Sequence, residues 1–418
     1  MMQDKILDYT HFLWHHILTN NYGGTIANDV SLASVYNVAT VCFPLIQLVA
    51  HQRSVQDTFK KCCLNGNLKF AKWIVKTYYQ VNNGTKLDGT IFVKVCKKIC
   101  SRGHLEVIKW FVETFKLTVE DIHTNENYAF RSSCVNGHIE VAKWLVQKFG
   151  LTADDARVID NYALRYSCEN GYIEVAKWLV QTFKLTVEDA RARDNYALRY
   201  SCENGYIEVA KWLVQIFSLT AEDVRARDNY ALCYTCANGY IDVAKWLIVT
   251  FGLTVNDVRG NDNYAFRHSC ANGHLIVAKL LVEIFGLTIE DVRACNNYTF
   301  GHSCENGHIK VAKWLVQTFE LTLEDARANN NYAFVHSCEN GLFNVVKWLT
   351  RTFDLIGDDA RAQNNYALKG SCVNGHIKIA KWLIQMFGLT RDDVCVDNDH
   401  IIRYCYVNGS DEMKELLF

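Results

Sequence analysis

The sequence is dominated by a repeat of 34 residues. One glycine recurs at this spacing ten times, at Gly103, Gly137, Gly171, Gly205, Gly239, Gly273, Gly307, Gly341, Gly375 and Gly409, and an earlier copy stands at Gly66. Everything after about residue 55 belongs to this pattern. A fixed period of this size is typical of stacked arrays in which each unit contacts only its neighbours. The length of 418 residues therefore reflects about 11 repeats and not several globular domains.

The composition indicates which classes of molecule the chain is not expected to bind. The formal net charge is −1, with acidic and basic residues interleaved. Nonspecific binding to nucleic acid needs a basic face, so we expect no nucleic-acid partner. The N-terminus lacks the apolar stretch of a signal peptide. The most apolar run, 35–50, is too short to span a bilayer, so we expect no membrane association.

The cysteines follow the repeat. Ten of the 17 occupy one repeat position, from Cys63 and Cys100 through Cys134 to Cys372. Stacked helices lie about 8–10 Å apart, whereas the Cα atoms of a disulfide are about 4.4–6.8 Å apart. Neighbouring copies therefore cannot pair. The pattern predicts small buried thiols in a reducing compartment, and hence a cytoplasmic protein.

Each unit predicts two helices. In the copy at 160–193, Asp160 and Asn161 are residues that commonly cap a helix N-terminus, and a short first helix should run from there to Asn170-Gly171, where glycine tolerates the left-handed backbone of a C-cap. A second helix is expected from about Ile173 to Phe183. Its apolar residues have the three- and four-residue spacing of a buried stripe: Ile173, Val175, Ala176, Leu179, Val180 and Phe183.

The segment that follows leaves two structures open. In "KLTVEDARARD", Thr186 and Asp189 have the spacing of a capping box, which predicts a third short helical turn. The alternative is an extended finger of the kind that many repeats of this length use as a connector. Glycine is only sporadic in this segment, which favours the helical turn.

The segment "ALRYSCENGYIEVAKWLV" resembles the ankyrin repeat. The resemblance covers roughly 55–418 and implies an all-α, or nearly all-α, solenoid of helix-turn-helix units with a connector. We divide the chain into a non-repeat helical segment, 1–54, a repeat array, 55–398, and a C-terminal capping repeat, 399–418. The family's Thr-Pro opening and its Gly-Ala-Asp-Val-Asn loop are absent here, and the period is 34 instead of 33.

Residues 1–54 have two interpretations. The first is a helical cap that covers the first repeat. The second is an F-box, a segment that docks on the Skp1 adaptor of a ubiquitin ligase, because "FLWHHIL" and "NDVSLASVYNVATVCFPLIQLV" resemble that family. The positions comparable to the F-box are Leu13, Ile17, Leu18, Leu32, Val35, Val38, Val41 and Cys42. The family's Leu-Pro opening is missing.

The sequence contains no motif that predicts a catalytic or metal-binding site. Phosphate-binding glycine loops, nucleophile elbows and His-Glu-x-x-His are all absent. The pair Cys233 and Cys236 has no partner pair at zinc-finger spacing. Cys134 and His138 recur in other copies with tyrosine in place of the histidine, which a metal ligand would not easily allow. We therefore predict no enzyme activity, no cofactor and no metal.

Differences between copies indicate where a partner binds. Two adjacent positions of the first helix vary between the copies. The first position is most often arginine, and the second is most often tyrosine or histidine. The ankyrin resemblance implies that the first helices line the concave side, and arginine and tyrosine dominate interface energetics. The predicted partner-binding strip is Arg131, Arg165, Tyr166, Arg199, Tyr200, Tyr234, Arg267, His268, His302 and His336. The alternative is that the rings fill gaps between helices while the arginines are solvated.

The sequence thus predicts a monomeric, non-enzymatic scaffold that binds a protein of unknown identity on its concave face. The alternative is an adaptor that recruits targets to a Skp1-containing ubiquitin ligase. The divergent repeat sequence of this array resembles the ankyrin arrays that are abundant in amoebae and in the large DNA viruses that infect them. That resemblance implies a target among host proteins, in the host cytoplasm.

Overall fold

The computed structural model describes residues 52–81 and 89–390, together with positions 393 and 412. The described residues form helices and turns and contain no strand, which confirms the all-α prediction. Contacts divide the chain into two compact units, Met1–Ala163 and Leu164–Phe418. The predicted boundary at 54/55 falls inside the first described helix, and nearly all of 399–418 lies outside the described residues.

The first unit contains three and a half helical pairs. Its helices are α3 (Gln52–Leu64), α4 (Leu68–Val81), α5 (Gly89–Ser101), α6 (Leu105–Phe115), α7 (Val119–Val135), α8 (Ile139–Phe149) and the start of α9 (Ala153–Glu169). In each pair the first helix ends at a tight turn and the second helix returns alongside it.

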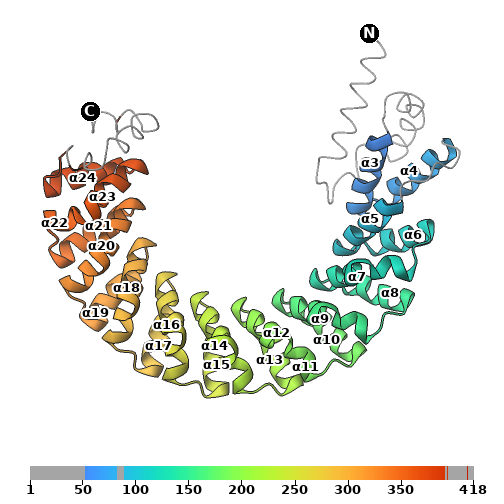
Figure 1. The fold of residues 1–418 in the computed structure, drawn as a ribbon, viewed down its shortest axis with the longest axis horizontal. Coiled ribbons are helices and arrows are strands. Elements are labelled where there is room, and N and C mark those ends of the chain that lie inside the picture. Colours follow the sequence, from blue (N-terminus) through green and yellow to red (C-terminus); the bar gives the residue numbers. More distant parts are fainter. Residues whose placement is uncertain (1–51, 82–88, 391–392, 394–411, 413–418) are drawn as a thin grey trace, which may run out of the picture. The chain divides into compact units, whose positions relative to one another are not determined.

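The second unit continues the same pattern. In Figure 1 its first helices follow one another in one row and its second helices in another. The helices are α10 (Ile173–Phe183), α11 (Val187–Ala190), α12 (Ala192–Glu203), α13 (Ile207–Phe217), α14 (Ala221–Ala237), α15 (Ile241–Phe251), α16 (Val255–Ala271), α17 (Leu275–Phe285), α18 (Ile289–Glu305), α19 (Ile309–Phe319), α20 (Leu323–Glu339), α21 (Phe343–Phe353), α22 (Gly357–Ala360), α23 (Ala362–Val373) and α24 (Ile377–Phe387).

The second helix of each unit forms where the apolar spacing predicts it. Helix α10 spans Ile173–Phe183 and buries Val175, Ala176, Leu179 and Phe183. It ends at Lys184, which adopts a left-handed conformation and donates its backbone N–H to the carbonyl of Val180. This closure satisfies one of the free carbonyls at the helix end.

The Asn-Gly turn between the two helices performs two tasks. Gly205 has φ of 77°, and its N–H donates to the carbonyl of Cys202 at 3.1 Å. A Cβ atom on Gly205 would lie 2.5 Å from the ring of Tyr240, the residue that occupies the same turn of the next unit. Glycine is therefore required both for the backbone conformation and for the close approach of the neighbouring ring.

The asparagine of the same turn joins successive units. The Nδ2 group of Asn204 donates to the carbonyl of Glu169 at 3.0 Å, at the end of the preceding first helix. The bond recurs from Asn238, Asn272, Asn306, Asn340 and Asn374 at 2.8–3.0 Å. The first helices from α9 to α20 thus each receive a donor for one terminal carbonyl from the next repeat.

The connector is a helical turn, which decides between the two structures that the sequence leaves open. Thr220 begins it, and Asp223 accepts the backbone N–H of Thr220 at 2.8 Å in a capping box. The same carboxylate accepts two hydrogen bonds from Arg191 of the preceding unit, at 2.7 and 3.0 Å. This bidentate pair recurs as Arg225–Asp257, Arg259–Asp291, Arg293–Asp325 and Arg327–Asp359.

The described cysteines at the repeated position are buried, as predicted. The described cysteines are all free thiols, and only Cys295 among them is exposed. Cys168 and Cys202 have no exposed surface. Burial raises the pKa of both thiols far above the ordinary value, so they behave as small apolar side chains.

Candidate protein-binding face

From α7 to α23, a left-handed turn of three residues separates the connector from the first helix of each repeat and lies inside the range of the labelled helix. In α12 these residues are Arg193, Asp194 and Asn195, with φ of 54°, 55° and 60°. The N-cap prediction for Asp160 and Asn161 is wrong, because both residues belong to such a turn, with φ of 53° and 60° in place of extended backbone. Left-handed backbone costs an L-residue about 1–2 kcal/mol, so the turn needs support from elsewhere.

Arginine supplies that support. Arg199 donates from Nε to the carbonyl of Asp194 at 2.6 Å and from Nη2 to the carbonyl of Arg193 at 3.1 Å. Its guanidinium carbon lies 4.6 Å from the centre of the Tyr230 ring in the next unit. Arg131 binds the carbonyls of Asn125 and Glu126 in the same way. The planar fork of arginine therefore holds two successive carbonyls of the turn.

The structure places the arginines of the predicted strip beneath the surface. Their exposed fractions lie between 1% and 9% for Arg131, Arg165, Arg199 and Arg267. The alternative in which these arginines are solvated is therefore wrong. Burial lowers the pKa of Arg199 from its ordinary value, and the nearby positive charge of Arg227 adds to this effect. The buried guanidinium groups support the turn, and the rings beside them remain half-buried.

The rings of the predicted strip form a continuous series in the second unit. The first helices α12, α14, α16, α18 and α20 each carry two rings in contact, as in Tyr196 and Tyr200, whose stacked ring centres are 4.0 Å apart. The ring centres are 3.8–4.1 Å apart within such a pair and 4.9–5.8 Å apart between successive repeats. We call this series the aromatic ladder: Tyr166, Tyr196, Tyr200, Tyr230, Tyr234, Tyr264, His268, Tyr298, His302, Tyr332, His336 and Tyr366.

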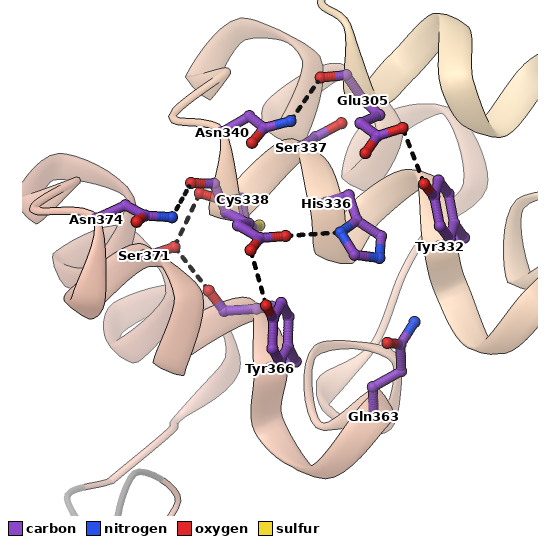
Figure 2. A network of polar contacts seen from close by, with 12 residues as sticks. Glu305, Tyr332, His336, Ser337, Cys338, Asn340, Gln363, Tyr366, Ser371 and Asn374 are labelled. Atoms are coloured by element: carbon purple, nitrogen blue, oxygen red, sulfur yellow. Dashed lines mark hydrogen bonds and ion pairs between the residues drawn. The ribbon is translucent and has the colours of Figure 1, made fainter. Parts of the chain in front are cut away.

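Glutamates fix the outer end of several tyrosines. The hydroxyl of Tyr332 donates to Glu305 at 2.9 Å, and that of Tyr366 donates to Glu339 at 2.7 Å, as Figure 2 shows for the end of the ladder. Tyr196 and Tyr230 bind Glu169 and Glu203 at 2.7 and 2.6 Å. Burial and the carboxylate together raise the pKa of Tyr230 well above its ordinary value, which keeps the phenol protonated and donating.

The histidines of the ladder have two different environments. Nδ1 of His336 lies 2.7 Å from Glu339, and Nδ1 of His302 lies 2.5 Å from Glu305. His268 has Ala271 at the corresponding position and gains no carboxylate. Burial, with the positive charge of Arg267 nearby, lowers the pKa of His268 to about 4. His268 is therefore a neutral ring at neutral pH.

Half of the ladder was not predicted from the sequence. The missed rings are the tyrosines of the Asn-Tyr pair in each unit: Tyr196, Tyr230, Tyr264, Tyr298, Tyr332 and Tyr366. A sequence signal for five of these tyrosines was available, because Tyr196, Tyr230, Tyr264, Tyr298 and Tyr332 each stand four residues before a residue of the predicted strip and so share its helix face. The predicted Skp1-docking residues Leu13, Ile17, Leu18, Leu32, Val35 and Val38 lie outside the described residues.

Neither a metal site nor a membrane-spanning helix is found where the chain is described. No group of three or more histidine, cysteine or acidic side chains in 52–81 and 89–390 could hold a metal ion. No described helix is long and apolar enough to cross a membrane. Burial raises the pKa of the Cys233 thiol to about 12, which makes it a poor nucleophile and a poor ligand.

The stacked helix pairs define a helical repeat protein. The family model for ankyrin repeats (3 copies) matches residues 93–189, 232–325 and 301–398, which together make up more than half of the chain. The chain therefore belongs to the ankyrin-repeat family. A comparison with curated proteins gave no match.

Proposed function

We propose that the chain is a non-enzymatic scaffold that binds a protein partner on the concave side formed by its first helices, with the aromatic ladder as the contact surface. The observation that carries this proposal is the continuous series of ring contacts, stacked within a helix and tilted between repeats, that half-buried rings make along successive first helices. Aromatic side chains bury much apolar area on binding. Rings already fixed by their neighbours lose little rotamer freedom, which favours affinity.

The polar groups of the ladder favour a protein over nucleic acid. Carboxylates of Glu169, Glu203, Glu305 and Glu339 stand beside the rings and would repel phosphates. The arginines that could attract phosphate are buried against the left-handed turns. The face therefore offers stacked rings with acceptor oxygens at their edges.

Photocrosslinking from chosen positions tests the binding face. A benzophenone-bearing residue replaces Tyr234 in the ladder in one variant and Val249 on a second helix in the other, where Val249 is 79% exposed. The partner should crosslink from position 234 and not from position 249. With the purified partner, Tyr200→Ser and Tyr234→Ser should each weaken binding by about tenfold, whereas Val249→Ser should not. Crosslinking from position 249 alone would place the interface on the second helices and end the proposal.

A second candidate function is that of an adaptor for a Skp1-containing ubiquitin ligase, favoured by the F-box resemblance of 1–54. The test is co-purification of Skp1 with the full chain and with its Leu13→Asp, Ile17→Asp double variant. Stoichiometric capture that the double variant loses would support the adaptor. Absence of Skp1 from both preparations would leave 1–54 as a cap.

We also place the protein in a reducing compartment, the cytoplasm, as a monomer. The free, buried thiols at the repeated cysteine position of the described residues support the reducing compartment. If the resemblance to arrays of amoebae and their large DNA viruses reflects the source, the cytoplasm is that of the host and the partner is a host protein.

A further inference from the structure

In one repeat the arginine that supports the left-handed turn is replaced by glycine. Gly301 occupies the position of Arg199, and a cavity of about 90 Å³ opens at this place. Its walls include Cys295, Asn296, Asn297, Tyr298, His302 and Tyr332. We call it the Gly301 cavity.

The walls of the Gly301 cavity match the surroundings of an arginine side chain. Cys295 and Asn296 correspond to Arg193 and Asp194, whose carbonyls accept the two hydrogen bonds of Arg199. Tyr332 corresponds to Tyr230, whose ring lies 4.6 Å from the guanidinium carbon of Arg199. The same relation holds between Arg267 and Tyr298, at 4.7 Å. Removal of the arginine leaves these acceptors and the aromatic ring in place.

Two other units that lack the arginine contain a substitute for it. Cys233 directs its thiol to the carbonyl of Asp228 at 3.7 Å. Behind Val335, the side chain of Gln363 in the next unit donates to the carbonyl of Asn330 at 3.1 Å. The residue corresponding to Gln363 at the Gly301 cavity is Asn329, which is one methylene shorter.

At the Gly301 cavity no described side chain donates to the carbonyl of Cys295 or Asn296. The unpaired Oδ1 atom of Asn297 does not distinguish this repeat, because the same atom is unpaired at Asn195 and Asn263, where the arginine is present. The counterpart carbonyls in other repeats accept hydrogen bonds from Arg199, Arg267 or Gln363. The cavity is therefore short of donors.

We propose that the Gly301 cavity is a binding site for the guanidinium group of an arginine supplied by a partner protein. A guanidinium is planar, carries donors in a fixed fork and stacks on aromatic faces, which fits two successive carbonyls beside the Tyr332 ring. An ammonium group has no plane to stack. Cys295, Asn296 and Asn329 are exposed, so the cavity opens to solvent at its rim. About three water molecules would fill it when no arginine is bound.

This inference rests on the proposed function for its ligand, because Tyr298, His302 and Tyr332 belong to the aromatic ladder. The site itself can be tested without the partner, since the probe is a small cation. Binding of the probe with no partner contact at the ladder would retain the site and refute the proposed function. Partner contact at the ladder without binding of the probe would do the reverse.

The test uses Cys295, the exposed thiol at the rim, as the reporter. The full chain is treated with iodoacetamide, and alkylation of Cys295 is followed by mass spectrometry of its peptide. N-acetyl-arginine amide should slow this alkylation several-fold in a saturable manner. N-acetyl-citrulline amide, which has nearly the same shape but no charge, should not.

Two variants separate the cavity from nonspecific effects. Gly301→Arg fills the cavity with its own side chain and should abolish protection by the probe. Its Cβ would lie 3.1 Å from the Tyr332 ring, so the ring must shift by a few tenths of an ångström. The double variant Arg193→Cys, Arg199→Gly should create a second protected thiol, whereas Arg193→Cys alone should not. Equal protection by the citrulline probe, or protection that persists in Gly301→Arg, would overturn the proposal.

Discussion

Arg293 and Asp325 join two successive repeats through parallel hydrogen bonds, from Nε to Oδ1 at 2.7 Å and from Nη2 to Oδ2 at 2.9 Å. The same carboxylate accepts the backbone N–H of Thr322 at 2.9 Å and thereby caps its own connector helix. Asp325 is 4% exposed, while the Arg293 side chain remains 44% exposed. One buried carboxylate therefore both starts a helix and connects it to the preceding repeat.

Replacing Asp325 with alanine should lower the free energy of unfolding by about 1–2 kcal/mol, because the cap and the bond to Arg293 are lost together. Urea unfolding followed by circular dichroism measures the change. Asp393 provides the matched control, since its side chain is 13% exposed and its bond to Arg361 is 3.0 Å long. Asp393→Ala should cost less. An equal loss at both positions would contradict this account.

Acid should weaken the array through the same carboxylates. Burial tends to raise the pKa of Asp325, but the hydrogen bonds from Arg293, Thr322 and Asn297 outweigh it and lower the pKa from 3.8 to about 2. Because the pKa of Asp325 is lower in the folded chain than in the unfolded chain, its carboxylate stabilises the fold above the unfolded pKa. This stabilisation is lost as the pH falls from about 4 to about 2. Urea midpoints between pH 6 and 2.5 should decline, and Asp325→Asn should show a weaker decline than the unaltered chain.

His268 should remain neutral well below pH 6. Burial and the nearby positive charges lower its pKa to about 4, so its contribution to stability is complete above the unfolded pKa of 6.5 and falls as the pH drops from there to about 4. A proton NMR titration of the ring measures the pKa directly. Ala271→Glu copies the position of Glu305 beside His302 and should raise the pKa of His268. A pKa near 6.5 in the unaltered chain would contradict the burial seen here.

Arg199 should be needed for the left-handed turn. Arg199→Met leaves the carbonyls of Arg193 and Asp194 without their buried donor and should cost about 2–3 kcal/mol of unfolding free energy. Arg199→Lys keeps the charge but not the fork and should recover only part of it. The reverse change, Cys233→Arg, should stabilise its turn. Unfolding midpoints of the three variants decide the matter.

Gly205 and Gly252 separate two roles of glycine. Both have positive φ, of 77° and 57°, but only at Gly205 would a Cβ meet a neighbouring ring, at 2.5 Å from Tyr240. Gly252→Ala should cost about 1 kcal/mol for the left-handed backbone alone. Gly205→Ala should cost clearly more. The melting temperatures of the two variants should differ, and similar values would mean that Tyr240 moves aside freely.

The second helices were predictable to the residue. Val175, Ala176 and Leu179 have the spacing of a helix, and the Asn-Gly turn marks where α10 begins. The end at Phe183 is marked only by the end of the apolar stripe, because Lys184, which adopts the left-handed conformation, is not a typical C-cap residue. The cysteine position was predictable for the same reason. Identical small side chains at one place in every copy indicate a shared core.

The turn before each first helix was not predictable from local preferences. Asp160 and Asn161 are common N-cap residues, and that preference led to the wrong conformation. The decisive interaction comes from an arginine five or six residues later, which binds the turn from within the core, as Arg199 does. Such an arginine resembles a surface residue in the sequence, because nothing nearby reveals that backbone carbonyls surround it.

The bonds between repeats have a consequence for the gene that encodes them. Arg191 meets Asp223 over 32 residues, Tyr196 meets Glu169 over 27, and Asn204 meets Glu169 over 35, always within adjacent units. Excision or insertion of one 34-residue segment would bring the same side chains face to face across the new junction. Unequal recombination could therefore lengthen or shorten the protein without inventing a single contact, while a unit such as the one with Gly301 could be gained or lost as a whole.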